Sequence, residues 1–494
     1  MSHARSTRLA APGGLAPTSE ASGRFPAGPL RSRVAALLFP PAPERSGPRW
    51  RSILFSVVFV AAATVASLLR QSGVSAVNSI WAEDGQVFYQ AVFHQSYLGA
   101  LFTQDNGYLD LVPRVLIGVL GHVPVAYAAE TFALVGAVGS SLVALAVYYA
   151  TAGHVPSRAL RLCMAIPTAV LIAGQLEVGN SIVNLQWYLI YAFFWMLLWS
   201  PRTVGAKVVA ALLLCAAIGS DPITVAFVPL LVVRLWALPW RESLWQVGGV
   251  LLGVAYQAVG FLQGDAAKRP QVPDYNLTYA ETRYRGQVLA EAISSPHELS
   301  FIGLHSIRTA EVAGLVALIV IGALGAWLAR PQWLMAGICI VFSVCFYFAV
   351  TSQGGLADQR YSVVPGLLLI AAAVFLVTPP APRAAADAVE PDAADAGAEP
   401  GGSGHGGHGS RSNRATLGSR VFLVPTAVLC VVLGLNFVAS YYGGIPTRGT
   451  SASWSSQVHA GTEACAHKGV TEAVLATAPG GHWVVDVPCS ALGR

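Results

Sequence analysis

The chain has 494 residues, of which 54% are hydrophobic and 11% charged, and its formal net charge is +5. Soluble domains carry roughly 25% charged residues, so this composition predicts an integral membrane protein and argues against a set of ordinary soluble domains. The basic residues lie in short loops without interleaved aromatic residues, which excludes nucleic acid as a partner.

Residues 1–48 are rich in Pro, Gly, Ser and Arg without hydrophobic periodicity, so we expect a disordered tail. Residues 49–441 contain repeated apolar segments, and a spanning helix needs about 20 mostly apolar residues. The segments that approach this length predict an all-α polytopic bundle of about 11 transmembrane helices: 53–69, 124–150, 160–175, 185–200, 205–220, 223–239, 243–263, 310–329, 332–351, 362–378 and 421–441.

The short loops predict the orientation of this bundle, because Lys and Arg are retained on the cytoplasmic side. The basic residues of these loops fall on one side if the N-terminus is cytoplasmic: Arg45, Arg49, Arg51, Arg158, Arg161, Arg202, Lys207, Arg241 and Arg330. This orientation places segments 70–123, 264–309 and 442–494 outside, and the low-complexity segment 379–420 inside as a disordered linker. The excess of Arg over Lys, with abundant Ala and Gly, indicates a GC-rich genome, so we expect a multi-pass protein of a bacterial plasma membrane with an external C-terminus.

Two of the external segments have internal order. In the 70–123 segment, pieces 86–103 and 109–122 are too short or too polar to span and predict surface helices. The 442–494 segment contains two apolar β-like pieces, VTEAVLATA and HWVVDVPC, and predicts a small external C-terminal subdomain. Cys465 and Cys489 are its two cysteines, and an oxidising compartment preserves disulfides, so we predict a bond between them.

Polar residues at the outer ends of the spans form the candidate site. Glu83 and Asp84 lie just beyond the first span, in the 70–123 segment, and acidic groups at a membrane edge are costly and tend to mark substrate or ion pathways. Other outer loops add further candidates for substrate binding: Asp110, Arg114, Glu177, Asn180, Asn184, Arg360 and Tyr361. A ligand pocket needs a few convergent polar groups on an apolar scaffold, and the outer face alone offers such a set.

Structural roles for the same residues stay open at this stage. Glu83 and Asp84 are suited to the N-terminus of a surface helix, where carboxylates are favourable. Arg360 is equally suited to anchoring a helix at the interface or pairing with Asp358.

The layout resembles a known family. An acidic pair in a long outer loop after span one, WAEDG, followed by a bundle with short loops and a late outer RY in ADQRYSVVP, is similar to the GT-C fold of membrane glycosyltransferases. The resemblance implies a sugar donor carried on polyprenyl phosphate, and an acceptor that is a cell-envelope glycan, lipid or protein. It implies that Asp84, or its neighbour Glu83, is the catalytic base and that Arg360 holds the carrier phosphate.

This chemistry suits the residue types. An acceptor hydroxyl that attacks an anomeric carbon needs a carboxylate to take its proton, and a guanidinium binds phosphate in bidentate fashion. Hard cations prefer oxygen ligands, and some members of the class use a divalent cation while others do not. Glu83 and Asp84 are therefore candidate ligands for such a cation, and we assign no cofactor with certainty and no metal site.

A transporter or flippase of a lipid or polysaccharide precursor is the alternative from another functional class. Such proteins often have internal repeats and interrupted helices with polar groups at the membrane midplane. The sequence shows no obvious repeat, and its polar residues cluster at the outer ends of the spans. The enzyme is therefore the preferred interpretation.

Overall fold

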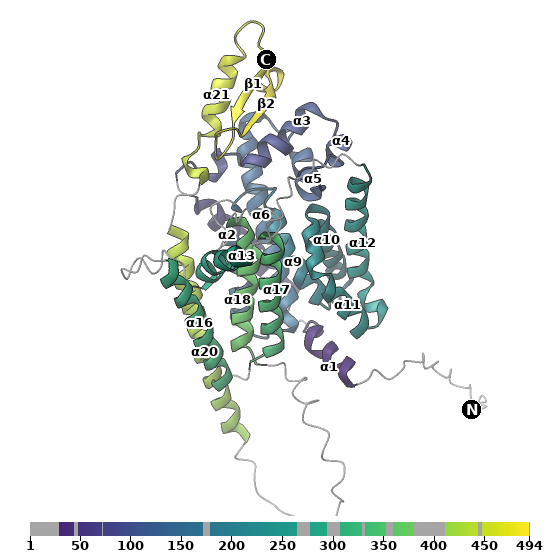
Figure 1. Cartoon of the computed structure of the whole chain (residues 1–494), viewed down its shortest axis with the longest axis vertical. Coiled ribbons are helices and arrows are strands. Elements are labelled where there is room, and N and C mark those ends of the chain that lie inside the picture. Colours follow the sequence, from purple (N-terminus) through teal and green to yellow (C-terminus); the bar gives the residue numbers. More distant parts are fainter. Residues whose placement is uncertain are drawn as a thin grey trace, which may run out of the picture.

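The computed structural model is mostly helical and describes residues 29–43, 48–71, 73–170, 178–263, 277–293, 307–328, 331–351, 359–379, 411–442 and 447–493. Figure 1 shows a helical bundle with a small unit containing strands β1 and β2 at one end. We call residues 447–493 the C-terminal unit.

Six of the described helices are long and apolar enough to cross a membrane, which makes the protein membrane-embedded. They are α2 (Arg49–Leu69), α6 (Ala128–Ala150), α12 (Trp240–Gln263), α16 (Ile307–Leu328), α17 (Trp333–Thr351) and the continuous helix Gln359–Val377, which ends with α18 (Val363–Val377). Shorter apolar helices lie in or beside the bundle: α5 (Leu111–Leu120), α7 (Arg158–Val170), α9 (Leu185–Leu198), α10 (Val204–Ser220), η5 (Pro222–Phe227) with α11 (Val228–Ala237), and the apolar part Val424–Val438 of α20 (Arg411–Tyr442). Each of the predicted apolar segments contains a helix, but the count of eleven spans stays a prediction.

Helices α9 and α18 form the centre of the bundle. Every residue of both helices is buried, and neither has the polar face of a surface helix. By contrast, only 11% of the most apolar part of α2 is buried within the structure, and its Ile53, Val57 and Val65 side chains face outward. This distribution is expected when lipid covers the outside of the bundle, because lipid chains are as apolar as the core.

Small residues allow α10 and α12 to pack closely below the 70–123 loop. A Cβ on Gly249 would lie 2.4 Å from the carbonyl oxygen of Ala211, so glycine is needed for this approach. On the same helix, Gln257 Nε2 donates to Leu109 O at 2.7 Å and Oε1 accepts from Leu109 N at 3.0 Å. The buried amide therefore ties the loop to the bundle.

The 70–123 loop folds as a series of short helices. They are η1 (Ala76–Asn78), η2 (Asp84–Tyr89), α3 (Gln90–His94), α4 (Tyr97–Leu101) and α5, followed by η3 (Val125–Tyr127). The predicted piece 86–103 is thus divided among η2, α3 and α4. Ser96 ends the first part of this run, because its hydroxyl accepts from Gly99 N and caps α4.

The N-terminal tail differs from its prediction. Residues 29–38 form helix α1 (Pro29–Leu38), and Leu38 and Phe39 are 5% and 3% exposed. Arg31 Nε donates to Ala237 O at 3.4 Å, which joins α1 to the end of α11. The expectation of disorder over all of 1–48 is therefore wrong for this part, because a short apolar run gains a packing partner that the sequence does not reveal.

The predicted 379–420 linker also differs at its end. Helix α20 begins at Arg411, ten residues before the predicted span, and so includes polar residues of the linker. Adding turns to an existing helix is far easier than starting one, which explains why the helix extends beyond its apolar part. Residues 380–410 lie outside the described residues.

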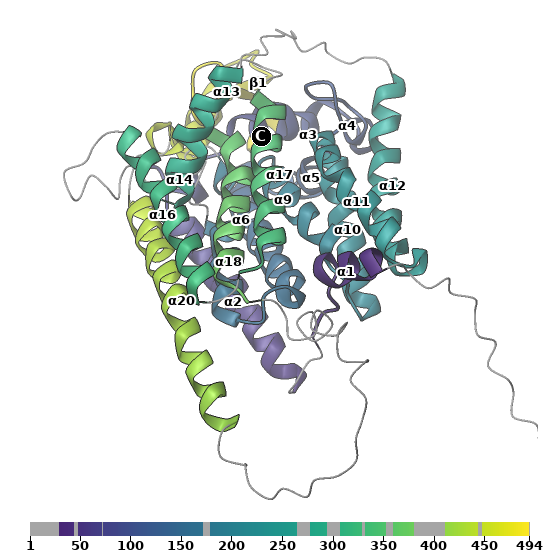
Figure 2. The same cartoon turned by 60° about the horizontal axis from the view of Figure 1, so that its bottom comes forward.

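The remaining described helices are short connections. They are η4 (Thr151–Gly153), α13 (Leu277–Arg283), η6 (Tyr284–Leu289), α14 (Ala290–Ile293) and η7 (Gln359–Ser362). Figure 2 shows α13 and α14 beside α16 and α20 on one side of the bundle.

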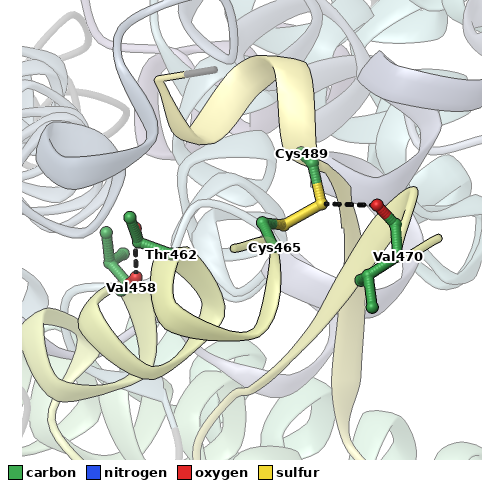
Figure 3. Close-up of a disulfide and its surroundings, with 5 residues drawn as sticks. All are labelled: Val458, Thr462, Cys465, Val470 and Cys489. Atoms are coloured by element: carbon green, nitrogen blue, oxygen red, sulfur yellow. Dashed lines mark hydrogen bonds between the residues drawn. A yellow bond between two sulfur atoms is a disulfide. The ribbon is translucent and has the colours of Figure 1, made fainter. Parts of the chain in front are cut away.

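The C-terminal unit comprises η8 (Thr447–Thr450), α21 (Trp454–Ala464), β1 (Glu472–Ala476), β2 (Val484–Pro488) and η9 (Cys489–Leu492). The two strands pair antiparallel and lie within the two segments predicted as β-like. Cys465 and Cys489 form a disulfide with a Cα–Cα distance of 5.6 Å. In Figure 3 this bond joins the end of α21 to the start of η9, and Cys489 Sγ lies 3.7 Å from Val470 O.

The C-terminal unit docks on the 70–123 loop and on η3, which follows it. Trp454 is 2% exposed, and its indole Nε1 donates to Val125 O at 2.7 Å. Ala478 N donates to Ile80 O at 2.8 Å beside an isolated bridge to Trp81. The last segment of the chain therefore covers the loop that carries the acidic pair.

Candidate functional site

The acidic pair lies where the 70–123 loop turns into η2. Gly85 N donates to Trp81 O at 2.9 Å, and residues Asp84–Tyr89 follow as a π-helical turn. Such turns are rare and frequently occur at functional sites. Successive helical residues point about 100° apart, so Glu83 and Asp84 reach different partners.

Asp84 points inward and is 0% exposed. Its Oδ2 accepts from Ile182 N at 3.1 Å and its Oδ1 accepts from Val183 N at 2.8 Å. Burial raises the pKa of Asp84 to about 6, while the Val183 N–H and the charge of Arg448 lower it. The carboxylate thus binds the segment between α7 and α9, here called the 178–184 segment.

Arg448 of the C-terminal unit binds the same segment from the other side. Its Nη1 donates to Gly179 O at 2.6 Å and to Asn180 O at 2.9 Å, and its Nη2 donates to Ser79 O at 3.4 Å. Burial lowers the pKa of Arg448 to about 10, and the charge of Asp84 opposes this shift. Asp84 therefore satisfies N–H groups of the 178–184 segment, and Arg448 satisfies its carbonyl groups.

Sequence reasoning missed Arg448. The available signal was a single Arg in the TRGT stretch that follows the last apolar segment. Charged side chains are almost never fully buried unless paired, and Arg448 is 3% exposed. Arg448 is buried because the C-terminal unit docks on the rest of the protein, and this docking cannot be predicted from the sequence.

Glu83 points toward Arg360 instead. Arg360 Nη1 lies 3.1 Å from Glu83 Oε1, and the two side chains are 27% and 15% exposed, so the pair is reachable from outside. The other oxygen, Glu83 Oε2, is buried and has no hydrogen-bond partner within the part of the chain that the structure describes. The prediction that Arg360 pairs with Asp358 cannot be compared, because residue 358 lies outside the described residues.

Aromatic rings lie beside this pair. The Arg360 guanidinium carbon is 5.6 Å from the Tyr361 ring centroid, and Tyr361 meets Trp187 edge to face at 5.4 Å. Trp187 belongs to the buried helix α9, so the rings connect the pair to the centre of the bundle. Near Glu83, the Trp81 Nε1 atom is buried and finds no acceptor within the described ranges.

The predicted amides hold the 178–184 segment in place. Asn180 has a φ of 55°, its Nδ2 donates to Ser67 O at 2.9 Å and its Oδ1 accepts from Ser67 Oγ at 2.8 Å. Asn184 Nδ2 donates to Ser181 Oγ at 3.2 Å, and its Oδ1 accepts from Trp187 Nε1 at 3.3 Å. These contacts give both residues a positioning role. Glu177 lies outside the described residues.

Asp110 and Arg114 lie farther along the loop, at α5. Asp110 is 2% exposed and precedes the helix, and Arg114 is 4% exposed one turn later. The Arg114 guanidinium carbon lies 4.8 Å from the Phe88 ring centroid. Their contacts thus differ from those of the Glu83–Arg360 pair.

The acidic pair does not form an evident metal site. Within the described ranges, no group of three or more His, Cys, Asp and Glu side chains is arranged to hold a metal ion. Glu83 and Asp84 bind different partners, so a cation shared by both would require one side chain to reorient.

Comparison with known proteins assigns no family to the chain. No protein-family model matches the sequence, and no curated protein is significantly similar to it. The residues and their geometry are therefore the basis for a functional proposal.

Proposed function

We propose that the protein is a membrane glycosyltransferase that transfers a sugar from polyprenyl phosphate to a cell-envelope glycan, lipid or protein. The observation that carries this proposal is the Glu83–Arg360 pair, a partly exposed carboxylate and guanidinium 3.1 Å apart. Lipid-linked glycosyl transfer needs these two groups side by side, one for the proton and one for the phosphate. The Tyr361 and Trp187 rings beside the pair add apolar surface to the site.

In the proposed reaction, the donor phosphate takes the place of Glu83 at Arg360. A dianionic or diester phosphate accepts two parallel N–H bonds from a guanidinium, and this exchange frees the Glu83 carboxylate. The acceptor oxygen then attacks the anomeric carbon, the bond from that carbon to the phosphate oxygen breaks, and the acceptor proton moves to Glu83. The polyprenyl phosphate leaves with the electron pair of the broken bond.

Exposure favours Glu83 over Asp84 as the base. A general base must come within hydrogen-bond distance of the proton that it takes, whereas Asp84 is 0% exposed and both of its oxygens accept backbone N–H groups. We assign Asp84 to positioning, because it fixes the 178–184 segment and the turn on which Glu83 lies. This proposal reverses the preference for Asp84 that the sequence alone favours.

We further propose the topology that such an enzyme requires. The short apolar helices would complete a bundle of eleven spans in a bacterial plasma membrane, with the N-terminus in the cytoplasm and the C-terminal unit outside. The Glu83–Arg360 pair would then face the outer side. Reporter fusions after Ser440 and after Gly264 test this topology, and a cytoplasmic signal at either position contradicts it.

The function is tested by following lipid-linked sugars in cells. Removal of the protein should cause one polyprenyl-phosphate sugar to accumulate, as measured by mass spectrometry of extracted lipids, and the intact gene should reverse this accumulation. Arg360→Ala should fail to reverse it, whereas Arg285→Ala, which disrupts the exposed Arg285–Glu281 pair, should succeed. If lipid levels stay normal while an unmodified precursor fails to cross the membrane, the protein is a flippase and the proposal is wrong.

A further inference from the structure

A small cavity lies beside η2, α3, α4 and α5, within the 70–123 loop. Its volume is about 30 Å³, and four of its lining residues are polar: Gln95, Tyr97, Arg114 and His122. No acidic side chain lines it. A cavity of this size has room for about two water molecules, or for the free oxygens of one phosphate group.

Arg114 gives the cavity its positive charge. The side chain is 4% exposed and packs over Phe88, yet its Nε lacks a hydrogen-bond partner in the described part of the chain. An unpaired buried donor costs free energy, and the side chain that carries it lines the cavity. Burial lowers the pKa of Arg114, and the charges of Asp110 and Asp105 oppose this shift, but neither acid lines the cavity.

A second donor is available at Gln95. Its Oε1 accepts from Thr103 Oγ1 at 3.1 Å, which leaves the amide NH₂ group to donate elsewhere. Arg114 and Gln95, whose side chains carry N–H donors, therefore line the same small space, and Tyr97 adds a third polar side chain. Several donors without an acidic neighbour in the wall are suited to an oxyanion.

The surroundings indicate where such an oxyanion would come from. Leu98 and Val119, on the helices that bound the cavity, are 68% and 60% exposed, and Tyr97 is 41% exposed. Short helices with exposed apolar side chains and polar groups close by are typical of the membrane interface, where they lie at the level of the lipid headgroups. A guanidinium at this level is suited to binding the phosphate of a lipid headgroup.

We propose that the Arg114 cavity binds the phosphate group of a membrane lipid, at a site separate from the Glu83–Arg360 pair. The Arg114 and Gln95 N–H groups bind the phosphate oxygens, and Leu98 and Val119 contact the apolar part of the lipid. This inference does not depend on glycosyl transfer. It assigns a ligand class to Arg114, which packs over Phe88 and lines the cavity.

The test measures thermal unfolding of the purified full-length protein in a non-ionic detergent. Short-chain phosphatidylglycerol is titrated in one arm, the matching diacylglycerol without phosphate in a second, and inorganic phosphate in a third. Phosphatidylglycerol should raise the melting temperature saturably, and Arg114→Gln should weaken its apparent affinity about tenfold, the effect of losing one charge-assisted bond. Arg285→Gln, which removes an exposed charge elsewhere, should leave that affinity unchanged.

The other outcomes also decide the matter. An equal shift with inorganic phosphate supports the phosphate site and assigns free phosphate as its source. An equal shift with diacylglycerol, or an unchanged phosphatidylglycerol affinity in Arg114→Gln, overturns the proposal. If Arg114→Gln does not fold, Gln95→Leu takes its place, and its affinity must then fall by about threefold or more.

Discussion

Replacement of Arg448 by Met tests whether the C-terminal unit holds the candidate site together. The change keeps the length and apolar stem of the side chain but removes the guanidinium. The carbonyl groups of Gly179 and Asn180 lose their donor, and Asp84 loses the positive charge that lowers its pKa. Breaking a buried charged contact by removing one partner typically costs about 3–5 kcal/mol, and we expect a loss of this order.

The assay is unfolding of the purified protein in detergent, combined with limited proteolysis of the C-terminal unit. Arg241→Met is the control, because Arg241 is exposed and its loss should change the free energy of unfolding by less than about 0.5 kcal/mol. A double-mutant cycle with Asp84→Asn should show a coupling of about 1 kcal/mol or more, since the two charges act on each other. Strictly additive effects, or an unchanged free energy of unfolding in Arg448→Met, would show that Arg448 does not hold the C-terminal unit and Asp84 together.

Three further predictions concern the surroundings of this contact. Because the pKa of Asp84 is raised from 3.8 to about 6, the folded state retains a proton that the unfolded state has lost between these pH values. The free energy of unfolding should therefore fall by on the order of 3 kcal/mol as pH rises from about 4 to 6. Asp84→Asn should abolish this component in unfolding curves measured over that range. Cys465→Ser should destabilise the C-terminal unit by about 3 kcal/mol in the chain-entropy model, because it removes the disulfide. Without reductant, protease should therefore cleave the unit faster in the variant than in the unmodified protein. Equal proteolysis rates would contradict this stabilising role of the disulfide. Gly85→Ala should make the C-terminal unit more sensitive to protease, because the added Cβ would lie 2.5 Å from Thr477 Cγ2. Adding Thr477→Ala to this variant should restore protection from protease. Full protection in Gly85→Ala alone would show that the Thr477 side chain moves to accommodate the added Cβ.

The sequence predicts the membrane-embedded helices because their signal is local. An apolar run of sufficient length has no favourable place except lipid or a protein interior, and its backbone must then form a helix. The same reasoning selects Glu83 and Asp84, whose charges are conspicuous beside the first span. It also selects Cys465 and Cys489 because they share one compartment.

The partners of these residues depend on long-range packing and could not be predicted. Glu83 and Arg360 are 277 residues apart, and Asp84 binds a segment almost 100 residues away. Which of the two acids turns inward is decided by the backbone N–H groups of Ile182 and Val183, which the sequence does not orient. Local reasoning therefore found the acidic pair but could not assign a separate role to each member.

The role of Asp110 and Arg114 illustrates the same limit. Sequence position groups them with Glu83 and Asp84 in one outer loop. The structure instead places Arg114 against Phe88 and a small cavity, after the chain has turned through η2, α3 and α4. The turns that separate the two sets, such as the Ser96 cap, have no strong signature in a loop rich in aromatic residues.

In the proposed reaction, Glu83 accepts a proton while Arg360 holds the donor phosphate. The most direct measurement is sugar transfer from synthetic polyprenyl-phosphate sugars by the purified protein in lipid vesicles. It compares Glu83→Gln and Asp84→Asn with the exposed control Glu281→Gln. Loss of a positioned general base costs about 100-fold or more in turnover, so Glu83→Gln should lose at least this factor and Glu281→Gln should match the unmodified protein. A normally folded Glu83→Gln variant with full turnover would show that Glu83 is not the base.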